Sequence, residues 1–106
     1  MFRTVIKHIR ADASVPFFDP KNSPLVPNFV KGYMSENFIK TGKLINTESQ
    51  ISADGLEIVF TTTWVNQNAY LEWKNDATIK NYLLAAGAQY REENNMQSVI
   101  LAEEEI

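Results

Sequence analysis

The segment that most constrains the fold is residues 58–76, IVFTTTWVNQNAYLEWKND, where a β-branched run ends at Trp64 and a short aromatic helix follows at once. Alternation along the run places Phe60 and Trp64 on one face of a strand, and we expect this face to cover the core. Asn66 can accept hydrogen bonds from the free amides at the start of the helix. A strand, a tryptophan, a polar cap and an amphipathic helix in this order indicate a small α+β architecture.

Three other segments have the pattern of β-strands. Side chains of Phe2–Arg10 alternate between two faces, and residues 43–52 are rich in β-forming residues. Asp54-Gly55 supplies a turn before the aromatic strand, so an antiparallel hairpin is expected. The last strand is predicted at Met96–Ala102, and Glu103–Glu105 is expected to be a solvated acidic tail.

Two helical regions complete the prediction. The first is expected to begin at Ser23-Pro24, because Ser caps free amides and Pro tolerates the first helical position, and to run to about Glu36. The second is a pair: the short aromatic helix, then a longer one capped by Asp76 or Thr78 and closed at Asn94-Asn95. Both regions carry a broad apolar face, which should pack on a sheet.

The order strand, helix, strand, strand, helix pair, strand is βαββαβ, the ferredoxin-like topology. It predicts an α+β fold in which helices cover one face of a four-stranded antiparallel sheet, in a single domain spanning residues 1–106. Apolar strand residues also point away from the helices, namely Val5, Ile9, Val59, Val99 and Leu101. A second subunit is the simplest cover for that face, so a homodimer is expected.

Bulk composition excludes several classes of function. The net charge is −3 and the basic residues are scattered, so no nucleic-acid partner is expected. The absence of cysteine excludes disulfides, thiolate catalysis and thiolate metal sites. No apolar run reaches the roughly 18 residues of a membrane span, and the first residues lack the apolar core of a signal peptide. A soluble, cytoplasmic protein without a membrane partner is expected.

The opening segment resembles the strand-end tryptophan and following helix of dimeric α/β-barrel proteins, including the antibiotic-biosynthesis-monooxygenase-like group. The resemblance covers residues 56–90 and rests on Thr63-Trp64, Asn66, Ala69-Tyr70, Trp73 and Asp76. It implies a homodimer whose two sheets pack into a barrel, with a small-molecule cleft between each sheet and its helices.

That group includes cofactor-independent oxygenases that act on polycyclic or quinol-like substrates, and haem-degrading enzymes. Trp64 matches the tryptophan that borders the cleft in haem-degrading members. Those members also have a haem-ligating His on the long helix, whereas residues 79–91 contain none. They use an Asn on the first strand, where this chain offers Thr4, Ile6 and His8. Neither haem degradation nor any other cofactor is therefore expected.

A cleft between helices and sheet would have apolar walls and a few hydroxyl groups, which suits a lipid-like or aromatic molecule. Its expected lining residues are His8, Phe29, Tyr33, Phe60, Trp64, Tyr82 and Leu83. Trp64 could stack on a flat ligand and donate an indole hydrogen bond, or it could simply plug the end of the core. Residues 11–22, which include Phe17-Phe18, could lie over a core edge or form the lip of a pocket.

His8 is the only histidine, so a histidine-centred triad and a multi-histidine metal site are excluded by counting. It is a weak candidate for a general base, and a structural or pocket-lining role is the alternative. Three functions remain open: a module that binds a small apolar molecule, a cofactor-independent monooxygenase-like enzyme, and a structural module whose cleft its own side chains fill.

Overall fold

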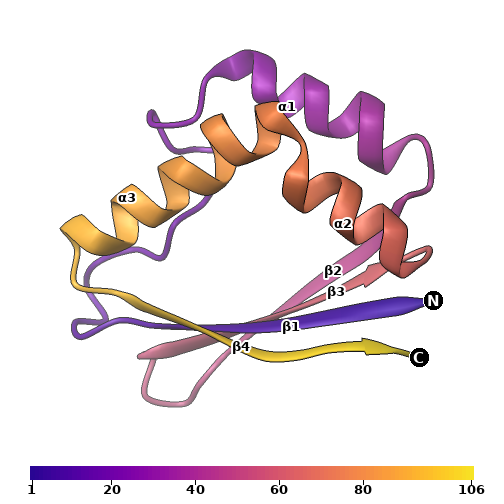
Figure 1. Ribbon diagram of the computed structural model, residues 1–106. Helices are drawn as coiled ribbons and strands as arrows, with labels where there is room; N and C mark the ends of the chain where they lie inside the picture. Colours follow the sequence, from indigo (N-terminus) through magenta and orange to yellow (C-terminus); the bar gives the residue numbers. More distant parts are fainter.

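The computed structural model describes residues 1–106 and contains the predicted order of strands and helices (Figure 1). The elements are β1 (Phe2–Ile9), α1 (Asn28–Met34), η1 (Ser35–Ile39), β2 (Leu44–Ile51), β3 (Glu57–Trp64), α2 (Gln67–Asn75), η2 (Ile79–Leu84), α3 (Ala85–Glu93) and β4 (Gln97–Glu105). The segments η1 and η2 are π-helical: η1 extends α1, and η2 leads directly into α3.

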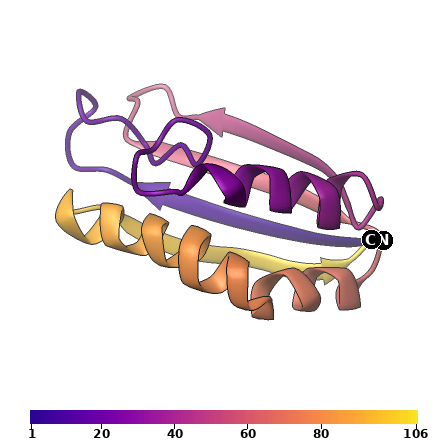
Figure 2. The ribbon, with the colours of Figure 1, turned by 90° about the horizontal axis from the view of Figure 1, so that it is seen from above.

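The sheet has the order β2-β3-β1-β4, and every neighbouring pair is antiparallel. The helices cover one face of it (Figure 1), and the view from above shows α1 beside the α2–α3 pair across that face (Figure 2). The chain ends lie together, because the Ile106 amide donates to the Met1 carbonyl oxygen at 2.9 Å. The predicted ferredoxin-like α+β fold is confirmed.

Polar caps fix the helices that follow β3. The Asn66 side chain accepts a hydrogen bond from the Ala69 amide at 2.8 Å, as predicted. Asp76 is the cap of the next helix, because its Oδ1 accepts from the Thr78 amide at 2.9 Å and from the Ile79 amide at 3.1 Å. Both caps satisfy amides that the first helical turn leaves without partners.

The predicted start of the first helix was wrong. Ser23 forms only a local turn, in which its Oγ accepts from the Leu25 amide at 3.2 Å, and α1 begins at Asn28. Pro27 is the reason: a residue that precedes proline is disfavoured in helical conformation, so Val26 ends the turn. Pro27 itself has an extended ψ of 145°. At its other end the helix continues beyond Glu36, through η1 to Ile39.

The acidic residues after Ala102 were also placed wrongly, because Glu103–Glu105 belong to β4 and are not a free tail. Glu104 pairs with Arg3 on β1 and forms an ion pair with its guanidinium. The Tyr70 hydroxyl donates to Glu103 Oε1 at 2.7 Å. Pairing with β1 satisfies the backbone, and these partners hold two of the three carboxylates, so the strand continues to the chain end.

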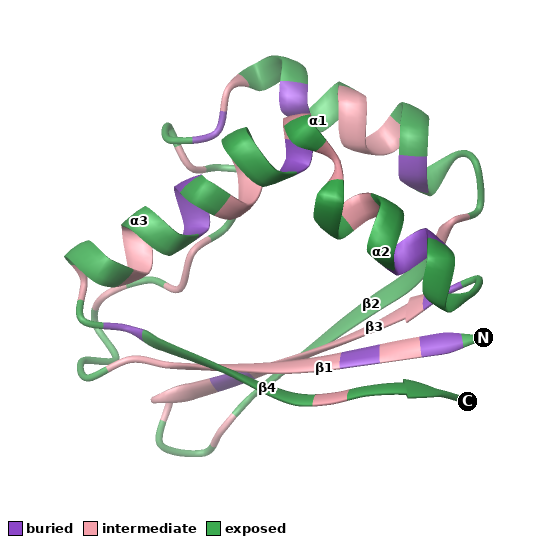
Figure 3. Ribbon diagram, viewed as in Figure 1, coloured by how far each residue is buried: buried purple, intermediate pink, exposed green.

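The core is small, with 13 of 106 residues buried, and it includes two separate clusters of apolar side chains. One cluster, Phe2, Trp64 and Tyr70, joins α2 to one end of the sheet, with Leu44 and Trp73 packed against it. The other, Val26, Val30 and Ala86 with Phe18 and Leu83, joins α1 to α3. Most residues of β2 and β4 are exposed on both faces (Figure 3).

We expect Asn66→Ala to lower the free energy of unfolding by about 1 kcal/mol, because the Ala69 amide loses its cap. Asn66→Asp keeps a side-chain oxygen at the same place and should retain most of the stability. Urea denaturation of the three proteins measures both effects. An equal loss in the Ala and Asp variants would show that the cap does not stabilise α2.

Candidate functional site

Trp64 is part of the core and has only 2% of its surface exposed. Its indole Nε1 donates to Thr4 Oγ1 at 3.2 Å, and its ring centroid lies 5.5 Å from that of Tyr70 and 5.2 Å from that of Trp73. Thr4 is itself buried, so this hydrogen bond satisfies a polar group that water cannot reach. The sequence left open whether Trp64 stacks on a ligand or fills the end of the core. This packing corresponds to the second role.

The predicted site residues on the helices fall into separate places. Phe29 of α1 and Tyr82 of η2 touch edge to face, with centroids 5.3 Å apart, and are 58% and 46% exposed. Leu83 packs against the cluster that joins α1 to α3. The Tyr33 hydroxyl donates to Asp76 Oδ2 at 2.5 Å. Only the pair Phe29–Tyr82 offers a ligand much aromatic surface.

Asp76 links the two helical regions, a role that sequence reasoning did not foresee. Partial burial opposes ionisation of its carboxyl group, but hydrogen bonds from the Tyr33 hydroxyl and the Ile79 and Thr78 amides outweigh it, so the pKa of Asp76 lies below its ordinary value. The same bond, together with burial, raises the pKa of Tyr33. The ionised Asp76 carboxylate therefore connects α1 to η2 through hydrogen bonds from Tyr33 and from the Ile79 amide.

His8 and Phe60 lie together on the helix side of the sheet. The ring of His8 meets that of Phe60 edge-on, with centroids 5.7 Å apart. Its Nδ1 is enclosed and has no hydrogen-bond partner. Burial, with a smaller contribution from the charge of Arg91, lowers the pKa of His8 to about 4. The ring is therefore neutral at pH 7 and holds an unmatched polar nitrogen.

An apolar row crosses three strands beside His8. Ile6 of β1 lies opposite Phe60 of β3 and opposite Ile100 of β4, so the three side chains share the helix side of the sheet. Ile100 is nevertheless 58% exposed. We call Ile6, His8, Phe60 and Ile100 the β1/β4 surface. It combines an uncovered apolar side chain with an unmatched polar atom, the usual composition of a small-molecule site.

The sequence did not single out Ile100, although Val99 and Leu101 were expected on the outer face and alternation then leaves Ile100 on the helix side. Val5 pairs with Ala102 but Ile6 pairs with Ile100, so Leu101 is the extra residue. In a strand of strict alternation, Ile100 and Ala102 would share one face. The pairing with β1 aligns Ile100 with Ile6 and shows that the bulge moves Ala102 to the outer face.

Arg10 anchors the connection between β1 and α1. Its Nε donates to the Gly55 carbonyl oxygen at 2.7 Å and its Nη1 to the Val15 carbonyl oxygen at 2.9 Å. The guanidinium also lies over the Phe17 ring, 4.1 Å from the centroid. One arginine thus ties the connection to the β2–β3 turn and holds Phe17 in place.

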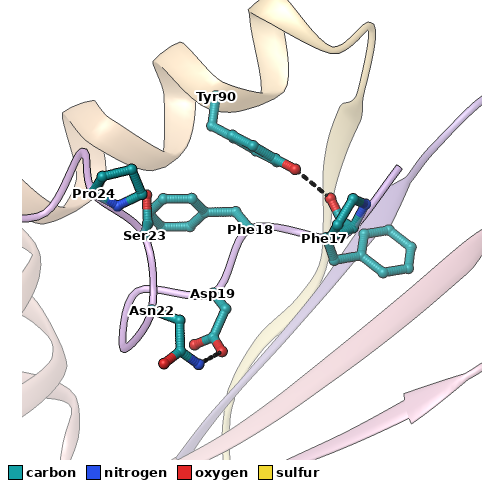
Figure 4. Close-up of a pocket in the computed structure, with 8 residues that line it drawn as sticks. Phe17, Phe18, Asp19, Asn22, Ser23, Pro24 and Tyr90 are labelled. Atoms are coloured by element: carbon teal, nitrogen blue, oxygen red, sulfur yellow. Dashed lines mark hydrogen bonds between the residues drawn. The ribbon is translucent and has the colours of Figure 1, made fainter. Parts of the chain in front are cut away.

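The connection also forms a hollow of about 260 Å³ with the end of α3 (Figure 4). The hydroxyl of Tyr90 donates to the Pro16 carbonyl oxygen at 2.6 Å, and the Phe18 and Tyr90 ring centroids lie 5.7 Å apart. The amide of Asn22 donates to Asp19 within the same loop. These polar groups satisfy one another, so the hollow offers a ligand fewer free contacts than the β1/β4 surface does.

Two further findings concern metal binding and membranes. No group of three His, Cys, Asp or Glu side chains is placed to hold a metal ion. No helix has both the length and the apolar character needed to cross a bilayer. The ionisable residue of the β1/β4 surface is His8, which is neutral at pH 7 and lies beside the apolar side chains of Ile6 and Phe60. Binding and proton transfer are the chemistry that such residues can supply.

Together, the fold and this surface define a ferredoxin-like α+β domain with an open helix-side sheet surface. Among solved structures, the chain is similar to Rv0793 from Mycobacterium tuberculosis, with 15% sequence identity and a TM-score of 0.42 over 100% of this chain and 98% of that one. The sequence matches no protein family model and no curated protein.

The single histidine gives a test by pH. The unfolded chain takes up a proton at His8 below about pH 6.5, whereas the folded protein does so only near pH 4. Stability should therefore be complete above pH 6.5 and fall as the pH falls towards 4. We expect the free energy of unfolding, measured by urea denaturation, to decrease between pH 7 and 5. In His8→Gln the decrease should be smaller, and equal slopes would contradict the buried neutral ring.

Proposed function

We propose that the protein binds a small apolar molecule, flat and aromatic or lipid-like, on the β1/β4 surface beneath the helices. The observation that carries the proposal is the exposure of Ile100, 58%, within a row of apolar side chains on the face that helices normally cover. A molecule that covers such a row removes apolar surface from water, which stabilises by about 25 cal/mol per Å². A ligand that covers Ile100 would also contact Ile6 and Phe60.

The helical layer supports the same proposal. Phe29 and Tyr82 form an exposed aromatic pair on two facing helical segments, and such a pair suits a ring or an alkyl chain that enters from the helix side. Tyr33 and Leu83 hold the segments on which the pair lies, through Asp76 and through the α1–α3 cluster. Trp64 fills the far end of the core, so it would limit the length of the site and not line it.

A second candidate function is a cofactor-independent monooxygenase-like enzyme, which one observation favours. His8 lies on the same face of the sheet as Ile100, and its Nδ1 has no hydrogen-bond partner within the protein, although the atom is enclosed. However, burial lowers the pKa of His8 to about 4, well below the value near 7 that suits proton abstraction at neutral pH. Binding is therefore the stronger of the two proposals.

We also propose that two copies associate through the outer face of the sheet. Val5 and Val59 are half-buried there and Val99 is 41% exposed. In the sheet Lys7 lies between Val59 and Val99, and it forms an ion pair with Glu57. Exposed apolar side chains on an uncovered sheet face favour association with a second copy. This interface is separate from the β1/β4 surface, which lies on the opposite side of the sheet.

Ligand binding can be tested with 2-naphthamide, a flat neutral probe. We expect saturable binding to the wild-type protein by fluorescence titration, and at least about ten-fold weaker binding to Ile100→Glu. Burying an isoleucine side chain stabilises by about 1.5–3 kcal/mol, which corresponds to ten-fold or more in affinity. Ile45→Glu places the same charge at an exposed residue of β2 and should bind as the wild type does.

Two results would contradict the proposed site: no saturable binding to the wild type, or equal affinity in the wild type and Ile100→Glu. Native mass spectrometry of the purified protein gives an independent readout, since a tightly held natural ligand adds its own mass. Extraction and identification of that molecule would name the ligand class directly.

Association can be tested by light scattering at micromolar concentration. We expect a mass twice the 12.1 kDa of one chain for the wild type, and 12.1 kDa for Val99→Glu, because burying an added carboxylate at the interface costs free energy. Ala88→Glu, at an exposed residue of α3, is the matched control and should remain a dimer. A wild-type protein that scatters as one chain would contradict the outer-face interface.

A further inference from the structure

Hydroxyl side chains border the apolar row on the β2 side of the sheet. Thr62 of β3 lies opposite Thr47 of β2, and their Oγ1 atoms are 3.3 Å apart. Ser49 of β2 lies opposite Phe60, and the alternation of β2 places it on the same face as Thr47. We call Thr47, Ser49 and Thr62 the hydroxyl cluster.

The hydroxyl cluster is on the helix side of the sheet. Thr62 also lies opposite Thr4 of β1, whose Oγ1 accepts the indole hydrogen bond of Trp64 in the core. Residues directly opposite one another in antiparallel strands share a face, so Thr62 and Thr47 lie on the face of Thr4. The cluster therefore shares a face with the apolar row of the β1/β4 surface.

A ligand can reach these hydroxyl groups. Thr47 and Ser49 are exposed and Thr62 is half-buried, and Figure 3 shows β2 exposed along most of its length. The contact between Thr47 and Thr62 uses the proton of one hydroxyl, so the other hydroxyl can still donate and both oxygens can still accept. The cluster thus offers donors and acceptors that the packing of the protein leaves accessible.

The hydroxyl cluster adjoins the apolar row at Phe60. Neighbours on one face of a strand are about 7 Å apart, as Phe60 and Thr62 are placed, and directly opposite residues such as Phe60 and Ser49 are about 5 Å apart. One line across the sheet runs from Ile100 through Ile6 and Phe60 to Ser49, so it is apolar at β4 and polar at β2. A flat ring on Phe60 would bring its substituent within reach of the hydroxyl groups.

The charges of this face disfavour an anionic ligand. The two basic residues of the strands, Arg3 and Lys7, point to the outer face, because they alternate with helix-side residues of β1. Glu103 and Glu105 of β4 lie opposite helix-side residues of β1, so the strands place two carboxylates and no cation on the helix side. A neutral oxygen therefore matches this face better than a carboxylate does.

We propose that the hydroxyl cluster binds a neutral oxygen of the ligand, a carbonyl or hydroxyl group, while the apolar part lies on the β1/β4 surface; this inference rests on the proposed function. A carbonyl oxygen accepts hydrogen bonds from the Thr and Ser hydroxyls, and a ligand hydroxyl or amide can also donate to them. The ligand class is then narrower than apolar molecules in general: it comprises neutral molecules with one polar end, such as aromatic ketones, amides and phenols.

Equilibrium dialysis with 2-naphthamide, which carries a neutral oxygen, and naphthalene, which carries none, tests the inference. The variant Thr47→Val/Ser49→Ala/Thr62→Val removes all three hydroxyl groups. We expect it to bind 2-naphthamide at least about two- to ten-fold more weakly than the wild type, the contribution of one neutral hydrogen bond, and naphthalene no more weakly. Circular dichroism and urea denaturation check that the variant is folded.

Two control variants separate the hydroxyl cluster from its surroundings. Thr63→Val removes a hydroxyl group from the outer face of β3 and should leave both affinities unchanged. Ile100→Glu should weaken both probes by similar factors, because it disrupts the apolar row that both rings would cover. Only loss of the hydroxyl cluster should affect 2-naphthamide selectively.

A carboxylate probe tests the charge preference. 2-Naphthoate has nearly the shape of 2-naphthamide but carries a negative charge. Glu103 is two strands from Thr62, about 10 Å at the usual strand spacing, and like charges at that distance in water reduce affinity about two-fold. We expect the wild type to bind 2-naphthoate at least about two-fold more weakly than 2-naphthamide.

The outcomes distinguish the two proposals. If both probes bind and the triple variant retains the wild-type affinity for 2-naphthamide, the apolar site stands and the role of the hydroxyl cluster is overturned. Tighter binding of 2-naphthoate than of 2-naphthamide would overturn the preference for a neutral oxygen. If neither naphthalene nor 2-naphthamide binds the wild type saturably, the proposed function and this inference are both wrong.

Discussion

The packing of Trp64 against Thr4 and Tyr70 determines how the helical layer sits on the sheet. The indole lies at the end of β3, its N–H is held by a buried hydroxyl on β1, and α2 begins within three residues. The helix must therefore start above this end of the sheet. Because a large aromatic side chain occupies the space there, the end near the chain termini is closed to solvent and to ligands.

At the other end of the sheet, the helices are held by the connection between β1 and α1. The connection after β1 is tied down by Arg10 and Tyr90, and its Phe18 packs into the cluster between α1 and α3. This second attachment joins helix to helix and to the connection, with little contact to β4. Between the two attachments the sheet is left partly uncovered, and Ile100 is exposed on its helix side. The proposed ligand site therefore lies between the two places where the helices are attached to the rest of the protein.

Local rules predicted much of the fold and only part of the candidate site. The caps at Asn66 and Asp76 and the alternation of β3 depend on residues close in sequence, so they could be read directly. The sequence also placed His8 and Phe60 on the same face, where their rings meet. It did not single out Ile100, because its exposure depends on which part of the sheet the distant helices leave uncovered.

By itself, the sequence determined the order of strands and helices, the ferredoxin-like topology and the absence of thiol chemistry, because periodicity, capping and composition are properties of neighbouring residues. Only the tertiary structure decided that Trp64 closes the core, that Glu103–Glu105 extend β4, and that Ile100 remains uncovered. Each of these depends on pairing or packing between residues distant in the chain. Such contacts exist only once the sheet has formed, so no local pattern encodes them.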